Sequence, residues 1–193
     1  MTTPRPDVTT HADGKDRCGW LNADDDYVRY HDEEWGRPLH GEREMFEQIT
    51  LEGFQAGLSW LTILRRRDHF REVFHDFDLD RVAAMSPADV ERLLQDARII
   101  RHRGKIEATI VNAQLVRDLD GGLDKLMWSF APPSRKNRLQ RLNQVPAVTP
   151  EAEAMSRALR RLGFKFVGPT TMYALMQSTG MVDDHVTRCW RAS

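Results

Sequence analysis

The sequence predicts an all-α protein, because helix-start signals and helical periodicity recur along the chain while alternating, strand-like patterns are hard to find. The run Ser86-Pro87-Ala88-Asp89 places a serine at the N-cap, a proline at the first helical position and a carboxylate at the third. Thr149-Pro150-Glu151 repeats this kind of start before another segment with helical spacing of apolar residues. The sequence therefore predicts the first residues of two helices.

The other elements are placed by composition and spacing. Acidic residues open a short helix expected over Asp24–Trp35, which carries two tyrosines on one face. The stretch Ala131–Pro146 contains three prolines and four basic residues, which predicts a loop or a hairpin. Residues 1–16 are expected to form a disordered tail, which leaves residues 17–193 as one helical domain. Further helices are expected at Glu42–Ala56, Trp60–Phe74, Arg103–Leu119 and Thr170–Thr179.

Composition limits the class of protein. A chain of 193 residues with 40% hydrophobic residues has the length of one domain and enough apolar side chains for a sizeable core. Its 28 basic and 29 acidic residues exclude a wholly basic protein of the histone kind but not a local basic patch. With only two cysteines and no long apolar run, we expect a protein of a reducing compartment, the cytoplasm, with no membrane segment.

One carboxylate occupies a position where a core residue is expected. In the helix over residues 42–56 the apolar stripe runs through Met45, Ile49 and Ala56, and Glu52 lies within the same stripe. Burying a charge is costly unless it is paired, so Glu52 is either part of a structural ion pair or points into a functional cavity. Trp60, shortly after it, is either ordinary core or the wall of an aromatic pocket.

Two pairs of metal-binding residue types stand near the ends of the chain. Cys18 and His31 are separated by twelve residues, and His185 and Cys189 by three. Four such ligands would make a closed tetrahedral zinc site joining the two ends. The spacing of the first pair is not that of a standard half-site, so unrelated buried cysteines and histidines are the alternative.

The segment Leu162–Thr170 has the features of a hairpin between two helices. Gly163 can end the first helix and Gly168 can open the second, whose N-terminal N–H groups favour an anion. With Lys165 close by, this is the arrangement of a clamp on the DNA backbone, and an ordinary turn between helices is the alternative. Three apolar side chains are expected to anchor the turn in the core, namely Phe164, Phe166 and Val167.

Basic residues gather at two helix ends. Arg157, Arg160 and Arg161 precede the hairpin, and the run Arg98–Lys105 leads into another helix. Clusters in these places suit contacts with phosphates, although most charge clusters are simply solvated faces.

These stretches together make the sequence resemble the bacterial 3-methyladenine DNA glycosylase I family, over residues from about Asp16 to Cys189. The resemblance implies a helix-hairpin-helix glycosylase fold, a structural zinc ion where the chain ends join, and removal of N3-methyladenine from alkylated DNA. The matching stretches are Arg17–Trp20, Tyr30–Gly36, Leu51–Trp60, Ile99–Ile106, Gly163–Gly168 and Val182–His185.

The resemblance also implies roles for individual residues. The zinc ligands would be Cys18, His31, His185 and Cys189. Gly57, Leu58, Lys165 and Gly168 would contact DNA, with Leu58 as the wedge that enters the duplex. The base would be bound by Tyr27, Tyr30, Trp35, Glu52 and Trp60.

Two residues depart from the family pattern. Phe54 stands where the family often carries a glutamine, at a position expected on the edge of the DNA-facing turn. Asp183 stands where close relatives usually have an asparagine. The wider superfamily places its catalytic aspartate near this point, so either Glu52 or Asp183 could be the catalytic carboxylate.

The expected enzyme is a monomer that acts on double-stranded DNA. It would flip the alkylated nucleotide out, release the base without cutting the strand, and leave an abasic site. A zinc-linked module that binds damaged DNA without catalysis is the alternative, and a free-base release assay separates the two. A zinc hydrolase is disfavoured, because four protein ligands leave no position for an activated water.

Overall fold

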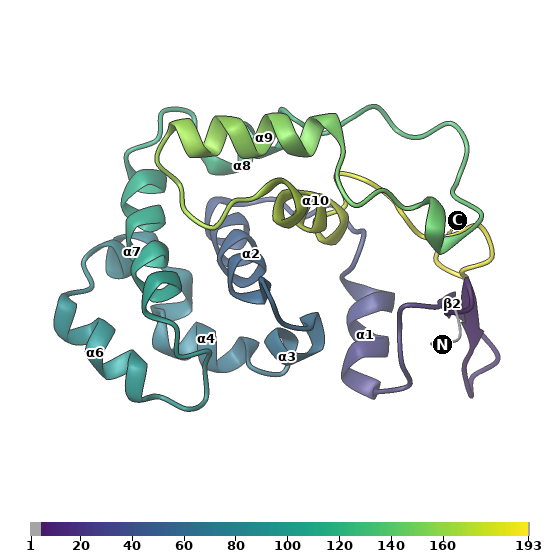
Figure 1. Cartoon of the computed structure of the whole chain (residues 1–193), viewed down its shortest axis with the longest axis horizontal. Helices are drawn as coiled ribbons and strands as arrows, with labels where there is room; N and C mark the ends of the chain where they lie inside the picture. The colour runs from purple at the N-terminus through teal and green to yellow at the C-terminus, as the bar shows by residue number, and fades with distance from the viewer. Residues whose placement is uncertain (1–4, 193) are drawn as a thin grey trace. The chain divides into compact units, whose positions relative to one another are not determined.

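A computed structural model describes residues 5–192 of the protein, and helices account for most of them (Figure 1). The predicted helical class is confirmed. Among the described residues, no helix combines the length and the apolar character needed to cross a membrane. The α-helices are α1 (Asp25–Glu33), α2 (Glu42–Gln55), α3 (Trp60–Leu64), α4 (Arg67–Val73), α5 (Leu79–Ala83), α6 (Pro87–Gln95), α7 (Arg103–Arg117), α8 (Leu123–Trp128), α9 (Pro150–Arg161) and α10 (Pro169–Ser178).

The chain divides into two compact units, whereas the sequence suggests one domain over residues 17–193. Unit 1 is assembled from three separate stretches, residues 5–38, 132–147 and 176–192. Unit 2 comprises Leu39–Ala131 and Val148–Leu175 and contains most of the helices. Each unit therefore joins stretches that lie far apart along the chain.

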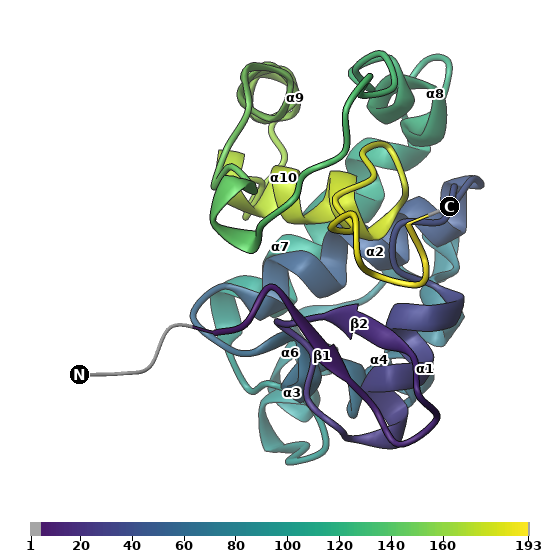
Figure 2. The ribbon, with the colours of Figure 1, turned by 90° about the vertical axis from the view of Figure 1, so that its right-hand side faces the viewer.

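The start of the chain differs from the expected disordered tail. Within its described part, strand β1 (Val8–Thr10) pairs in antiparallel fashion with β2 (Asp16–Cys18), as Figure 2 shows. The buried Arg17 side chain holds this hairpin, because it donates hydrogen bonds to the carboxylates of Asp13 and Asp32. A polar composition suggested disorder, but ion pairs made by the buried Arg17 supply the order that apolar residues do not. Residues 1–4 of the expected tail lie outside the described residues.

The predicted helix starts are confirmed by their caps. The Ser86 side chain accepts a hydrogen bond from the Asp89 backbone, and the Asp89 carboxylate accepts one from the Ser86 N–H, which completes a capping box for α6. The Thr149 side chain caps α9 in the same position. These starts were readable because a cap involves residues within three positions of each other.

Other helix boundaries differ from the prediction. The single helix expected over Trp60–Phe74 is two helices, α3 and α4, separated at Arg65 and Arg66. Helices α5 and α8 were not predicted, since five or six residues are too few to show a helical period. The stretch Ala131–Pro146 is a loop, as expected, with a short 3-10 helix at Leu142–Gln144.

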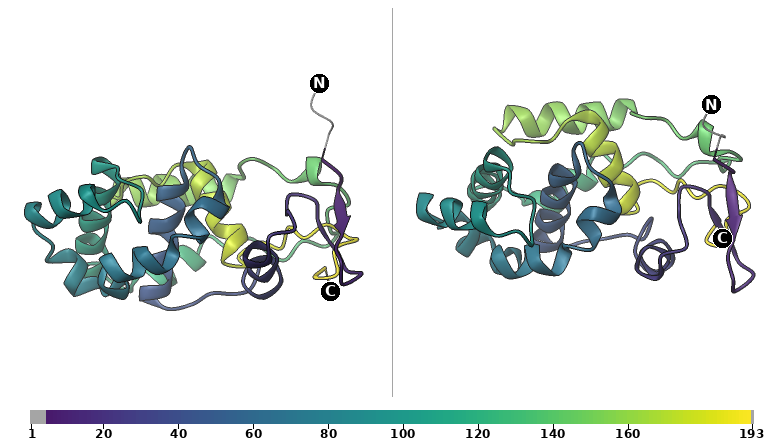
Figure 3. Two further views of the ribbon diagram at one scale, coloured as in Figure 1. Left: turned by 90° about the horizontal axis from the view of Figure 1, so that it is seen from below. Right: turned by 60° about the horizontal axis from the view of Figure 1, so that its bottom comes forward.

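In unit 2, α7 packs against α2, α5 and α6, and α2 also contacts α8. Figure 3 shows the blue and teal helices of this unit grouped together. Helix α2 buries most of its length, including the carboxylate that the sequence singled out. Phenylalanines from α2 itself and from residues 70–77 pack together on its buried side, with Phe54 and Phe70 ring centroids 4.7 Å apart. The C-terminal end of α2 and the start of α7 are thereby held as one packed body. The fully buried phenylalanines are Phe46, Phe54, Phe70, Phe74 and Phe77.

Candidate functional site

Three of the four predicted metal ligands lie together in unit 1. Cys18 at the end of β2, His31 on α1 and Cys189 near the C-terminus each offer one ligand atom, and these atoms lie within 4.8 Å of one another. All three side chains are buried. We call this group the Cys–His cluster, and its thiolate and imidazole groups are of the kind that bind a transition metal.

The fourth predicted ligand, His185, lies beside the Cys–His cluster but outside its 4.8 Å limit. Its ring centroid is 5.1 Å from that of His31. Its Nε2 is buried and has no hydrogen-bond partner among the described residues, although a buried imidazole nitrogen normally has one. Gly36, at a positive φ of 76°, makes room for this ring, since a Cβ there would come within 2.9 Å of His185 Cε1.

Each of the two histidines is oriented by a carboxylate. His31 Nδ1 lies 2.8 Å from Asp32, and His185 Nδ1 lies 2.9 Å from Asp183. A carboxylate on Nδ1 directs the other ring nitrogen toward a ligand, an arrangement common in metal sites. Asp32 in turn accepts hydrogen bonds from Arg17, which is buried with it.

The acidity of these groups follows from their contacts. Partial burial alone would raise the pKa of Asp183, but hydrogen bonds from His185 and Arg138 outweigh it and hold that pKa at about 2. In the Cys–His cluster, the hydrogen bond between the two thiols lowers the pKa of Cys189 and raises that of Cys18. His31 also lowers the pKa of Cys189, so one thiolate forms readily beside the imidazole.

Four aromatic side chains of unit 1 form an aromatic cluster, made of Trp20, Tyr27, Tyr30 and Trp35. The Trp20 ring is central, with centroids 5.2 Å from Tyr27 and 5.0 Å from Trp35. Tyr27 and Tyr30 are stacked with centroids 6.3 Å apart, and burial raises the pKa of Tyr27 to about 12. At neutral pH the Tyr27 phenol therefore keeps its proton and can donate a hydrogen bond.

Within this cluster, Trp35 also contacts His185, the fourth predicted metal ligand. Its ring centroid lies 4.6 Å from that of His185, in an edge-to-face arrangement. Trp20 was not among the predicted site residues, although it closes the Arg17–Trp20 stretch that carries Cys18. Its position two residues after a ligand candidate was the signal that could have identified it.

In unit 2, Glu52 is buried as the helical stripe predicts, with only 3% of its surface exposed. Gln48, one turn earlier on α2, donates a hydrogen bond to its Oε1 at 3.2 Å. Ala56, the expected end of the stripe, is instead exposed because α2 ends at Gln55. Trp60 is also buried and begins α3, whose N-terminus is capped by the Ser59 side chain.

Residues 56–59, which we call the exposed turn, connect α2 to α3. All four are exposed, and Leu58 presents 42% of its surface to solvent. Gly57 has a positive φ of 86°, a backbone conformation that glycine adopts without steric cost. The surroundings of Gly53 and Gly57 differ, since a Cβ on Gly53 would meet Phe166 at 3.3 Å while one on Gly57 would meet nothing within 4 Å.

The connection between α9 and α10, residues 162–168, is braced from two sides. Asn112 on α7 exchanges two hydrogen bonds with the backbone of Lys165, and the Ser156 hydroxyl donates to the carbonyl of Val167. The Lys165 side chain is exposed, and Gly168 precedes the first turn of α10. The N–H groups of such a first turn lack intrahelical partners and can bind an anion.

One of the three apolar side chains expected to anchor this connection in the core does not do so. Phe164 and Val167 are buried, but Phe166 is 40% exposed. Its backbone has a positive φ of 57°, which turns the side chain out over Gly53 and toward His102. A positive φ in a phenylalanine could not be read from apolar spacing, because it depends on the packing of α2 and α7 around it.

A family model described as methyladenine glycosylase matches residues 20–192, nearly the whole chain. The chain belongs to the methyladenine glycosylase family. The family assignment made from the motifs is therefore confirmed.

Relatives and solved structures of this family match over almost their full lengths. DNA-3-methyladenine glycosylase 1 of Escherichia coli is 47% identical over 90% of this chain and 95% of its own, and DNA-3-methyladenine glycosylase of Haemophilus influenzae is 42% identical. A crystal structure of 3-methyladenine DNA glycosylase I superposes with a TM-score of 0.87 at 46% identity, covering 90% of this chain and 98% of that one. A Staphylococcus aureus structure that concerns 3-methyladenine recognition has a TM-score of 0.84 at 34% identity, covering 89% and 94%.

The structure shows what surrounds the two residues that depart from the methyladenine glycosylase pattern. Phe54 is buried against Phe70 rather than placed on the edge of a DNA-facing turn, because it lies on the inner side of α2. Asp183 is exposed and binds His185, while its neighbour Asp184 is buried. Arg135 and Gln177 hold the Asp184 carboxylate, each at 2.9 Å.

Three cations of the basic run before and within α7 have partners within the protein. Arg98 forms an ion pair with Glu72, and Arg103 with Glu91. Lys105 points inward and binds backbone carbonyl groups. Lys105 is buried and does not face phosphates, whereas phosphate contact by the exposed Arg98 and Arg103 side chains stays a prediction.

Proposed function

We propose that this protein is a DNA glycosylase that excises 3-methyladenine from alkylated DNA. The observation that carries the proposal is the 47% identity to a DNA-3-methyladenine glycosylase over 90% of the chain. In unit 2, the buried Glu52 and Trp60 support recognition of a cationic base.

The substrate's own chemistry explains why such residues suffice. Methylation at N3 places a delocalised positive charge on the purine, which makes it a good leaving group without a strong general acid. The N-glycosidic bond breaks, and its electron pair leaves with the base and cancels the charge. Water then bonds to the sugar carbon left behind and releases one proton to solvent, which leaves a hydroxyl on the sugar. The product is an abasic site on an uncut strand.

Each unit contributes candidates for binding the flipped base. In unit 2, the Glu52 carboxylate accepts a hydrogen bond from the exocyclic amine and favours a cationic base over neutral adenine. Aromatic rings stack on the cation, and each such contact is worth about 0.5–2 kcal/mol. The proposed base-binding residues are Tyr27, Tyr30, Trp35, Glu52 and Trp60.

Double-stranded DNA is bound, in this proposal, by a helix-hairpin-helix element formed by α9, residues 162–168 and α10. The exposed Lys165 and the backbone around Gly168 contact phosphates. Leu58, on the exposed turn with Gly57, enters the space that the flipped nucleotide leaves.

We further propose one structural zinc ion held by Cys18, His31, His185 and Cys189. The close group of three ligand atoms and the unpartnered Nε2 of His185 support this set. Bound there, zinc supplies cross-links between the N-terminal and C-terminal parts of unit 1. Four protein ligands leave it no open position, so it takes no part in the chemistry.

Asp183 is proposed to orient His185 rather than to act on the sugar. Its carboxylate is occupied by the His185 backbone N–H, His185 Nδ1 and Arg138. Glu52 is therefore the carboxylate assigned to the base.

The decisive experiment is to incubate the purified protein with methylated duplex DNA and to identify the released bases by chromatography. We expect free 3-methyladenine, intact strands before alkaline treatment, and no adenine from unmethylated DNA. Binding of methylated DNA without release of any base would overturn the enzymatic function in favour of a non-catalytic binding module.

A further inference from the structure

We propose that Lys105 is a positioning residue that sets the exposed turn, and with it Leu58, in the conformation that enters DNA. The inference rests on the proposed function and deepens it, because it assigns a role to a buried cation that base recognition and phosphate contact leave unexplained.

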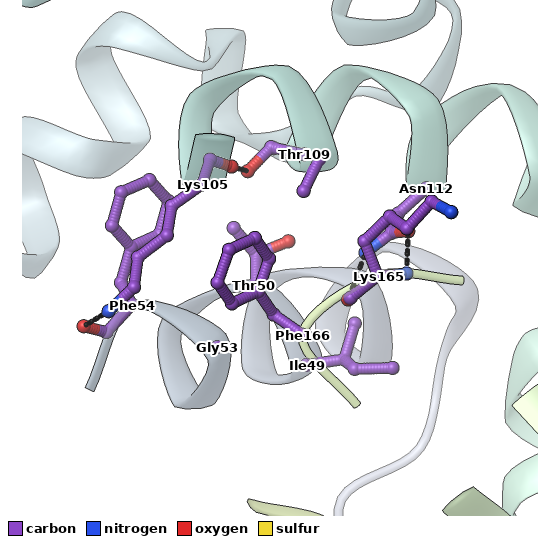
Figure 4. Close-up of a pocket in the computed structure, with 10 residues that line it drawn as sticks. Ile49, Thr50, Gly53, Phe54, Lys105, Thr109, Asn112, Lys165 and Phe166 are labelled. Atoms are coloured by element: carbon purple, nitrogen blue, oxygen red, sulfur yellow. Dashed lines mark hydrogen bonds between the residues drawn. The ribbon is translucent and has the colours of Figure 1, made fainter. Parts of the chain in front are cut away.

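Lys105 reaches from the first turn of α7 to the C-terminal end of α2 (Figure 4). Its Nζ donates hydrogen bonds to the carbonyl oxygens of Phe54 and Ala56, at 2.9 and 2.8 Å. Only 7% of the residue is exposed. A buried lysine bound to backbone carbonyls is rare, because burial disfavours its charge.

These two bonds perform the task of a helix cap. The last carbonyl groups of a helix lack intrahelical partners and carry the negative end of the helix dipole, so a cation there satisfies both needs. Helix α2 ends at Gln55 with Ala56 as its C-cap, and Gly57 occupies the following position, where a glycine at positive φ commonly ends a helix. Ala56 has φ and ψ of −49° and 113°, so the chain has left the helical conformation where Lys105 binds the Ala56 carbonyl.

The second bond controls the direction of the chain beyond the helix. The Ala56 carbonyl belongs to the same rigid peptide plane as the Gly57 nitrogen, so binding that oxygen fixes the orientation from which Gly57 turns. Gly57 then adopts its positive φ, and the Leu58 N–H returns to the Gln55 carbonyl at 2.6 Å. Leu58 is left exposed between a lysine-capped helix end and the Ser59 cap of α3.

Lys105 also adjoins the connection between α9 and α10. Its Nζ lies 5.9 Å from the centre of the Phe166 ring, the side chain that closes over Gly53. The cation thus contacts both segments of unit 2 that are proposed to touch DNA. This placement distinguishes Lys105 from a lysine that only fills space.

A double-mutant cycle tests the proposal, with Lys105→Met and Leu58→Ala made singly and together. Binding is measured to a duplex that carries a tetrahydrofuran abasic-site analogue. We expect Lys105→Met to weaken binding about tenfold when Leu58 is present, and by less than about twofold when it is absent. Equal losses in both backgrounds would overturn the proposal, since Lys105 would then act independently of Leu58.

Two further measurements separate positioning from general damage. Affinity for free 3-methyladenine should stay within about twofold of wild type in Lys105→Met, because the base does not need the wedge; a loss equal to that for DNA would contradict the proposal. If Lys105→Met fails to fold, as judged by circular dichroism, Lys105→Gln keeps a hydrogen-bond donor and takes its place in the cycle.

The matched control is Arg101→Met, which removes an exposed cation from the same stretch without touching the exposed turn. Its effect should be the same with and without Leu58. If the wild-type protein neither binds the analogue nor releases 3-methyladenine, the proposed function itself fails. If the wild type is active but the Lys105 cycle is additive, only the positioning role fails.

Discussion

Asp183 binds His185 twice, through the backbone N–H at 3.1 Å and through ring Nδ1 at 2.9 Å. A carboxylate two residues before the histidine thereby fixes both its backbone and its ring. The Arg138 guanidinium holds the other oxygen of the same carboxylate at 2.6 Å. The side chain that a superfamily comparison offers as catalytic is thus engaged in orienting a metal-ligand candidate.

From this arrangement we predict that Asp183→Asn costs little and Asp183→Ala costs more. The amide oxygen of asparagine can still accept from the His185 ring, whereas alanine leaves Nδ1 without its partner. Metal affinity, measured by competition with a chelator, should fall about 10–100-fold in Asp183→Ala and less than that in Asp183→Asn. Unchanged metal retention in Asp183→Ala would remove the orienting role.

A second prediction concerns the metal itself. Protein purified without added metal should contain one zinc per chain by elemental analysis, and Cys189→Ser should lose it and unfold at a lower temperature. Metal binding and folding are coupled, so the loss of activity in this variant should track the unfolded fraction. Thr187→Ser, a nearby exposed position that keeps its hydroxyl, is the control. A Cys189→Ser protein with wild-type stability would exclude a structural metal.

A third prediction assigns the base-recognising carboxylate. Glu52→Gln preserves shape but removes the negative charge, so a cationic base loses about 1–3 kcal/mol of binding, or roughly fivefold to 150-fold in affinity. Binding of free 3-methyladenine and single-turnover excision should both fall, while Asp183→Asn should excise at close to the wild-type rate. Should the two variants behave the other way round, the aspartate is the catalytic carboxylate.

The fourth prediction concerns the connection between α9 and α10. Lys165→Ala should weaken binding to damaged and undamaged duplexes alike and reduce the salt dependence by about one ion, because a phosphate contact reads no sequence. Titrations at several salt concentrations measure both effects. Lys125→Ala, on α8, removes a cation away from this connection and serves as the control. An unchanged affinity for undamaged DNA in Lys165→Ala would show that this segment does not bind the backbone.

The sequence alone determined those features that depend on residues close together along the chain. Capping requires neighbours within three positions, so the starts of α6 and α9 were readable at Ser86 and Thr149. The helical period in α2 likewise revealed that Glu52 is buried. The family motifs identified the remaining candidates, since a motif records which residue types a site needs.

Only the tertiary structure decided the features that depend on contacts between distant segments. The hairpin of β1 and β2 was missed because Arg17 orders it through Asp32, fifteen residues away. Lys105 was taken for a phosphate ligand because nothing nearby in sequence reveals that Phe54 and Ala56 lie within reach of its amine. A charged side chain has a low free energy with water, with an ion pair or with a helix end, and only the folded chain determines which of these partners is present.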